Sequence, residues 1–430
     1  MRREAAEPHV KRKLKGVIFR MSAKKTLIAT IATVTVLVAV LSTTYYIPGE
    51  TATVPASSEA GLEQALTSPD YLAAAQQREE AATAGTEPET GEDAGVFEGA
   101  QDDLNQDAAE GTAHDDEEEE EEPPSAIVTI TISAAGDVTL GGDPRGSNQF
   151  MREFERNEQD HSHFLRNVKH IFDADDLTIV NLEGTLTEAT AHMNKTYVFR
   201  GPPHFAKILS SSGVDAVTLA NNHSIDFLEL GYQDTADALE AEGIAYFGND
   251  FNTILEIKGI RVGLFGFRFW ENNQWNRNQI TSAIKDLQER GAQLIIAYFH
   301  WGIESASTPS AYQRTLGRFT IDSGADLVLG AQPHVLQAIE EYNGKNIVYS
   351  LANFCFGGNN NPTDQDTFIF QQTFTFDDGE LQDTNETNII PVLISSERWR
   401  NNFQPIVAEG DVAQRILQRL QTYSDRFAAG

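Results

Sequence analysis

From residue 126 onward the sequence is a succession of short apolar runs, and this pattern constrains the fold more than any other feature. The runs include AIVTITISAAGD, LTIVNLEG, IRVGLFGF and AQLIIAYFHWG, and each has the length of a buried strand. Amphipathic stretches that suit helices lie between several runs, at 204–212, 231–242 and 280–290. This alternation predicts an α/β domain, while the later runs TFIFQQTFTF and NIIPVLIS predict antiparallel strands that close the sheet. A short C-terminal helix is expected over 411–424.

Six of these runs end in a cluster of small and polar residues. The clusters are Gly136-Asp137, Asn181 to Gly184, Asn221 to His223, His300 to Glu304, Gln332 to His334, and Ser350 to Phe354. Sites in α/β sheets form beyond the carboxyl ends of the strands. Six strand ends of the same character therefore predict one shared site.

The residue types in these clusters indicate metal chemistry. They offer Asp, Glu, Asn and three His, and the only cysteine of the chain, Cys355, is not among the ligand candidates. Mixed carboxylate and imidazole ligands suit zinc, manganese or iron, and a carboxylate between two cations suits two-metal hydrolysis. Taken singly, His223 could instead cap a following helix, and His300 could be a hydrogen-bonded core histidine. The sequence has no nucleophile elbow, P-loop or dinucleotide-binding glycine motif.

The segment before the apolar runs divides into a basic part and an uncharged part. Residues 1–25 are rich in Lys and Arg, and the next 24 residues, 26–49, carry no charge. An uncharged apolar run of this length predicts a transmembrane anchor over 26–47. A cleaved signal peptide and a buried core helix are the alternatives, but the run is long and has no clear cleavage motif. Basic residues stay cytoplasmic, so we expect a single-pass membrane protein whose main domain is extracytoplasmic.

Residues 48–125 are strongly acidic and end in DDEEEEEEPP. Low hydrophobicity and like charge predict a disordered tether, with an interaction tail as the alternative. The formal net charge of the whole chain is −32. This excess argues against nucleic acid as a partner, because phosphate binding needs a basic face.

Six motifs from 127 to 395 resemble the bacterial capsule-synthesis CapA family, also called the poly-γ-glutamate synthesis family. They are AAGDVTLGG, NLEGTLT, NNHSIDF, HWGIE, GADLVLGAQPHVLQ and YSLANF. That family is similar in fold to calcineurin-like metallophosphoesterases. The resemblance therefore implies a four-layer sandwich of two mixed sheets flanked by helices over 126–396, followed by a C-terminal tail over 397–430.

The resemblance also assigns roles to individual residues. The implied metal ligands are Asp137, Glu183, Asn222, His300 and His334. Asp137 and His223 are the implied catalytic residues, with His223 as proton donor. Candidate substrate contacts are Lys195, Arg200, Glu304, Gln332 and Asn353, although Arg200 could equally be an ordinary surface residue.

The sequence departs from the family pattern at three positions. Thr139 stands two residues after Asp137, where the phosphoesterases carry a histidine. Gln332 replaces the first histidine of a His-x-His motif, and Ala352 replaces the glycine of YSLGNF. An amide oxygen binds zinc-like ions more weakly than imidazole does. We therefore expect one tight transition-metal site (Zn, Mn or Fe) and a second metal that binds weakly or not at all.

The function that these features predict is the biosynthesis or processing of an anionic cell-surface polymer, poly-γ-glutamate by resemblance. A metal-dependent hydrolase or transferase site would act on it, and the membrane and a capsule synthesis complex are the expected partners. One alternative is a non-catalytic component of a polymer synthesis or export complex. A general extracellular metallophosphoesterase is another.

Overall fold

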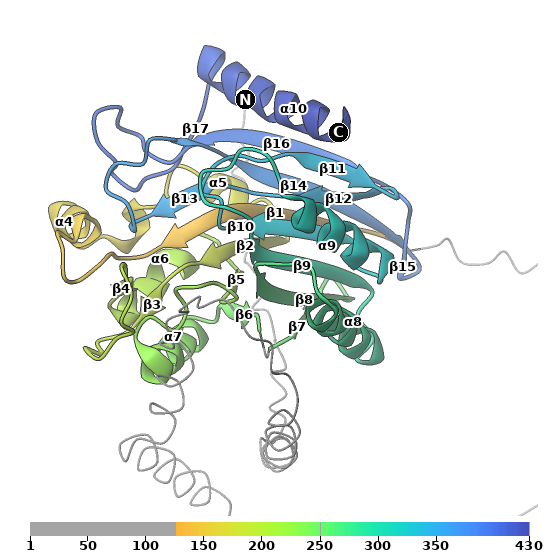
Figure 1. Cartoon of the computed structure of the whole chain (residues 1–430), viewed down its shortest axis with the longest axis horizontal. Helices are drawn as coiled ribbons and strands as arrows, with labels where there is room; N and C mark the ends of the chain where they lie inside the picture. The colour runs from red at the N-terminus through yellow and green to blue at the C-terminus, as the bar shows by residue number, and fades with distance from the viewer. Residues whose placement is uncertain (1–125, 250, 430) are drawn as a thin grey trace, which may run out of the picture. The chain divides into compact units, whose positions relative to one another are not determined.

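A computed structural model describes residues 126–249 and 251–429 of the chain (Figure 1). The predicted basic segment, membrane anchor and acidic tether lie outside these described residues. Within 126–249 and 251–429, no helix has the length and apolar character needed to cross a membrane.

The first sheet is mixed and is built around the long strand β1 (Ile127–Thr139). Its strands, in spatial order, are β17 (Ile406–Val407), β16 (Glu386–Leu393), β14 (Asp366–Asp377), β1, β2 (Leu177–Leu182), β5 (Ala216–Thr218) and β6 (Ala245–Phe247). Strand β13 (Asn353–Phe356) also pairs with β1, and β15 (Glu380–Leu381) pairs with β14. Strands β1, β2, β5 and β6 run parallel, whereas β14 and β16 are antiparallel, as the sequence predicted for the later runs.

The second sheet is also mixed. Its order is β11 (Ile339–Tyr342), β12 (Lys345–Val348), β10 (Leu327–Ala331), β9 (Leu294–Trp301), β8 (Ile260–Phe269) and β7 (Thr253–Ile257). The four strands β8, β9, β10 and β12 are parallel. A separate two-stranded sheet joins β3 (Thr185–Leu186) to β4 (Arg200–Gly201).

Three hydrophobic clusters show how the layers pack. One contains residues of both sheets, such as Ile132 of β1 and Ile296 of β9, and forms the core between them. A second joins the first sheet to α4 (Gln149–Arg156), α5 (Lys169–Phe172), α6 (Ala206–Ser210) and α7 (Leu228–Ala241), with the 3-10 turns His161–His163 and Pro203–Phe205 nearby. A third joins the second sheet to α8 (Gln274–Glu289) and α9 (Ala311–Asp322). The predicted α/β domain of mixed sheets flanked by helices is confirmed.

The C-terminal helix is longer than the sequence pattern predicted. Helix α10 spans Gly410–Ala429 rather than 411–424 and lies against β11 and β16 (Figure 1). Its residues Ile416 and Leu420 belong to the core between the sheets. The C-terminal residues are therefore part of the packed domain, because the apolar face of this helix is buried there.

One glycine fixes the path of β1 at its carboxyl end. The pairing register of β1 shifts around Asp137 with both β2 and β13, and the Asp137 amide donates to the Ala352 carbonyl at 2.9 Å. A Cβ atom on Gly136 would lie 1.8 Å from that carbonyl oxygen. Only glycine allows this close approach, which places the Asp137 side chain at the strand end.

Gly136→Ala should lower the free energy of unfolding by about 3 kcal/mol, because the backbone must move to relieve the overlap. Chemical denaturation of the purified protein measures this change. Gly146→Ala is the matched control, since its added Cβ meets only the Asp143 carbonyl at 3.7 Å. Equal stability of the two variants would contradict this account of the β1 bend.

Candidate metal centre

The predicted site residues converge because the parallel strands of both sheets end at one edge of the sandwich. Asp137 lies in β1, Glu183 follows β2, and Asn222 and His223 follow β5 in the first sheet. His300 lies in β9 and His334 follows β10 in the second sheet. One carboxylate oxygen of Asp137, one of Glu183 and a ring nitrogen of His334 lie within 4.8 Å of one another.

The Asp137 side chain is held in place by polar partners from two other strand ends, and a third strand end orients one of these partners. Its Oδ1 accepts from Asn181 Nδ2 at 2.8 Å, and its Oδ2 lies 2.9 Å from His334 Nδ1. Asn353 Oδ1 lies 3.0 Å from the same imidazole nitrogen, and its Nδ2 donates to the His334 carbonyl. Asn353, predicted as a substrate contact, thus orients His334 in the structure.

Glu183 is the most unusual residue of the site. Its side chain is buried, and neither carboxylate oxygen has a hydrogen-bond partner among the described residues. Its Oε1 lies 3.9 to 4.0 Å from the Nε2 atoms of three histidines, His223, His300 and His334. This separation is about twice a zinc–ligand bond. An unpartnered buried carboxylate is costly, so the donors present fit a cation between them.

The electrostatics of the site follow from burial. Burial raises the pKa of Glu183 to about 8, and the negative charge of Asp137 adds to this shift. Burial alone would lower the pKa of His334, but Glu183 and Asp137 outweigh it and raise that pKa to about 9. Burial lowers the pKa of His300 well below its ordinary value, and the positive charges of His334, His223 and Arg268 lower it further. His300 is therefore a neutral imidazole, the form that binds metals.

Asn222 and His300 form the other side of the site. His300 Nε2 lies 2.8 Å from Asn222 Oδ1. The loop that carries Asn222 is fixed by Asn221, whose Nδ2 donates to Asn181 Oδ1 and to the Leu182 carbonyl. Two of the predicted ligands are therefore in contact with each other, and the His300 nitrogen of this pair faces Glu183.

His223 is fixed by a buried aspartate that the sequence motif did not assign. Its Nδ1 lies 2.6 Å from Asp226 Oδ2, and the Phe199 ring stacks on the imidazole at 4.2 Å. Lys195 Nζ donates to Asp226 Oδ1 and to the Asn222 carbonyl, both at 2.8 Å. Burial lowers the pKa of His223, while the hydrogen bond to Asp226 opposes this shift.

Two predicted substrate contacts are already engaged by other groups of the protein. Lys195 is engaged by Asp226, as described above. The Arg200 guanidinium lies over the Phe227 ring, 5.2 Å from its centroid, and donates to the Ala189 carbonyl. The structure does not bring Arg200 to the triad of Asp137, Glu183 and His334.

Gln332 and Glu304 pair with each other at the edge of the site. Gln332 Nε2 donates to Glu304 Oε1 at 3.2 Å, while Gln332 Oε1 is buried without a hydrogen-bond partner among the described residues. Gln332 and His334 adopt positive φ angles of 92° and 58°. Such strained backbone is retained at sites where side-chain placement matters.

Sequence reasoning missed three residues around the site. Asp226 lies three residues after His223, a spacing that could have been noticed in NNHSID. Arg268 and Trp270 lie at the carboxyl end of β8, where the run IRVGLFGF was expected to stop without a polar cluster. The charged residue directly after that run was the available signal.

Of two hollows among the described residues, only the larger one adjoins the site. A hollow of about 870 Å³ adjoins the site loops through Ser305 and Val335, and its far wall is α10 with Arg415 and Arg419. Both arginines pair with Asp364 or Asp366.

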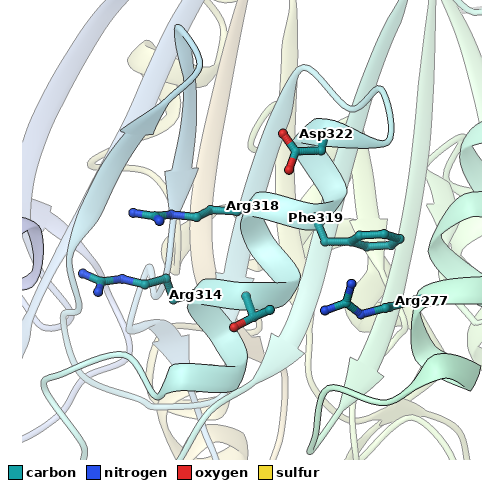
Figure 2. Close-up of a pocket in the computed structure, with 6 residues that line it drawn as sticks. Arg277, Arg314, Arg318, Phe319 and Asp322 are labelled. Atoms are coloured by element: carbon teal, nitrogen blue, oxygen red, sulfur yellow. The ribbon is translucent and has the colours of Figure 1, made fainter.

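A smaller hollow of about 280 Å³ lies over α9 and is lined by Arg277, Arg314 and Arg318 (Figure 2). Leu316 and Ile321 on the other side of α9 pack against the second sheet. The arginine hollow is therefore separated from the metal site by α9 and the sheet.

Glu183→Gln should abolish tight binding of zinc or manganese, because an amide cannot supply the anionic oxygen between the three imidazoles. Isothermal titration calorimetry and metal analysis of the purified protein measure this loss. Glu304→Gln is the matched control at the same sheet edge and should bind metal as the natural protein does. Unchanged stoichiometry and affinity in Glu183→Gln would show that this carboxylate is not a ligand.

With a chelator present, the protein should lose stability as the pH rises from about 4.5 to about 9. Glu183 ionises near 4.5 in the unfolded chain but near 8 in the fold, so the unfolded state releases its proton first. The pKa of His334 is likewise higher in the fold, about 9 against 6.5 in the unfolded chain, so its contribution to stability is also lost as the pH rises. Melting temperatures across this pH range should fall more steeply for the natural protein than for Glu183→Gln. Parallel curves would refute the assignment of these shifts.

Comparison with known proteins places this site in a family. The family described as "Bacterial capsule synthesis protein PGA_cap" matches residues 131–358. The "Capsule biosynthesis protein CapA" of Bacillus anthracis is 32% identical over an alignment of 173 residues, gaps included, that covers 35% of this chain and 42% of that protein. The "PGA biosynthesis protein CapA" of Bacillus subtilis (strain 168) is 26% identical over an alignment of 210 residues that covers 44% of this chain and 55% of that protein.

The matches therefore span about half the length of these two relatives. A crystal structure of a hypothetical protein from Thermus thermophilus aligns with a TM-score of 0.37 and 16% identity, covering 61% of this chain and 99% of that one. The family match covers more than half of the 430 residues and includes Asp137, Glu183, His223, His300 and His334. The chain belongs to the bacterial capsule synthesis protein PGA_cap family.

Proposed function

We propose that this protein is a membrane-anchored, extracytoplasmic hydrolase or transferase that processes an anionic cell-surface polymer of the poly-γ-glutamate type. One observation carries the proposal: the buried Glu183 carboxylate has no hydrogen-bond partner among the described residues and faces three imidazole nitrogens. The names of the relatives, which refer to capsule and PGA biosynthesis, support the polymer. The basic residues before the apolar run at 26–47 support the orientation.

Asp137, Glu183 and His334 would hold a divalent transition metal, with His300 and Asn222 beside them. A metal of this kind polarises a carbonyl or phosphoryl oxygen and lowers the pKa of water. The residues of the chain orient these donors: Asn181 and Asn353 fix Asp137 and His334, and the bend at Gly136 sets the position of Asp137.

His223 is the proton donor of the proposed reaction. Asp226 accepts from Nδ1, which leaves Nε2 directed toward Glu183 and the substrate side of the site. The buried aspartate stabilises the protonated ring, and Lys195 balances the charge of Asp226. A leaving group near Nε2 would receive the proton.

The second candidate function is a non-catalytic role in a polymer synthesis or export complex. Gln332 favours this role, because it replaces the first histidine of the His-x-His motif. Its Nε2 donates to Glu304 Oε1. In that case the site binds metal and polymer without turnover.

His223→Ala should slow turnover of poly-γ-glutamate by about 10²–10⁴-fold while metal content stays unchanged, because a general acid is lost but no ligand of the triad is. His170→Ala, an exposed histidine outside the site, should retain full activity. Chain-length analysis of the polymer, with zinc or manganese added, measures turnover, and a generic phosphodiester serves as the second substrate. No turnover of the polymer by the natural protein favours the non-catalytic role, whereas faster cleavage of the phosphodiester favours a general phosphoesterase.

A further inference from the structure

The carboxyl end of β8 presents two residues to the metal site. Along β8, Val262 and Leu264 face the core between the sheets, whereas Phe265 and Phe267 face the helices. A Cβ on Gly266 would meet Thr218 of the first sheet, which confirms that the even-numbered residues of β8 point into the space between the two sheets. Arg268 and then Trp270, just past the strand end, continue that alternation at the edge where the site lies.

Both residues lie beside His300. The Arg268 backbone is the register partner of His300 on the neighbouring strand β9. The Trp270 ring meets the His300 imidazole edge-on, with ring centroids 6.2 Å apart and planes at 79°. The side chains at the end of β8 are therefore next to a candidate metal ligand.

The two side chains are available to a ligand. Arg268 is exposed as a residue, although partial burial of its guanidinium lowers the pKa of that group, and the guanidinium has no hydrogen bond or ion pair within residues 126–249 and 251–429. Trp270 is 48% exposed although it is a large apolar side chain. By contrast, Lys195 near the site is occupied by Asp226. Unlike Lys195, Arg268 therefore has no carboxylate partner among the described residues, and it lies beside a candidate metal ligand.

We infer that Arg268 and Trp270 form a carboxylate subsite that binds the polymer beside the bond held at the metal triad. This inference rests on the proposed function. A γ-linked glutamate chain keeps one free carboxylate on each residue, next to each amide bond. Arginine binds carboxylates through two parallel hydrogen bonds, and an indole face accommodates methylene groups.

The charge of the site explains why such a subsite is needed. Asp137, Glu183 and Glu304 give this edge of the domain acidic groups, which repel an anionic chain. The Arg268 guanidinium at the edge of the metal site offsets that repulsion locally. The arginine hollow over α9 is the competing anion site, but it lies behind the second sheet (Figure 2).

Calorimetric titration of the full-length protein with a short γ-linked glutamate oligomer tests the subsite. Arg268→Gln should weaken binding about tenfold or more, as expected for the loss of a charge-assisted hydrogen bond. Arg268→Lys should restore part of the affinity. Arg261→Gln, on the same strand, and Arg277→Gln, in the arginine hollow, should bind as the natural protein does. Melting temperatures check that each variant is folded.

A neutral oligomer, with each free carboxylate converted to an amide, separates charge from packing. The natural protein and Arg268→Gln should bind it equally weakly, whereas Trp270→Ala should weaken binding of both oligomers. Unchanged binding of the acidic oligomer by Arg268→Gln, no binding by the natural protein, or a loss that Arg277→Gln reproduces would each overturn the subsite. Arg268-dependent binding of inorganic phosphate that is tighter than binding of the oligomer would overturn the carboxylate assignment.

The titration does not depend on turnover. Arg268-dependent binding without hydrolysis or transfer would contradict the proposed catalytic function and leave the subsite standing. Turnover that is unaffected by Arg268→Gln, together with unchanged binding, would contradict the subsite alone.

Discussion

The structure depends on a buried carboxylate that the protein itself does not satisfy. Glu183 lies at the point where the two sheets meet, and its oxygens have no hydrogen-bond donor among the described residues. Burying an anion without a partner opposes folding unless a positive charge compensates it. With Glu183, the side chains of His300, His334 and the nearby Asp137 form a set of donors for which a divalent cation is the natural partner.

The surrounding framework holds these donors in position. Gly136 allows the β1 backbone to approach Ala352, and Ala352 itself adopts a φ of 61°. Asparagines rather than apolar residues fill the space behind the ligands, with Asn181 bonded to Asp137 and Asn221 bonded to Asn181. This polar network orients the ligands through hydrogen bonds, in the manner of outer-shell partners in metal sites.

Much of the site was predictable because strand ends and residue types are local features. The runs ending in Asp137, Glu183, Asn222, His300 and His334 were recognised as strands from their apolar length, and parallel strands place their carboxyl ends together. The same pattern did not reveal α9, whose Ser310 and Gln313 form a capping box, and it made α10 too short. Those helices are specified by their packing against the sheets, which the local pattern shows only weakly.

The sequence by itself determined the strand order along the chain, the mixed carboxylate and imidazole chemistry, and the family. Only the tertiary structure decided which groups are free. It directs Lys195 onto Asp226, turns Arg200 toward Phe227, and leaves Arg268 exposed beside His300. The physical reason is that partner choice depends on the register between strands and the contact between the two sheets. Residues far apart in the chain set both, and no local pattern records them.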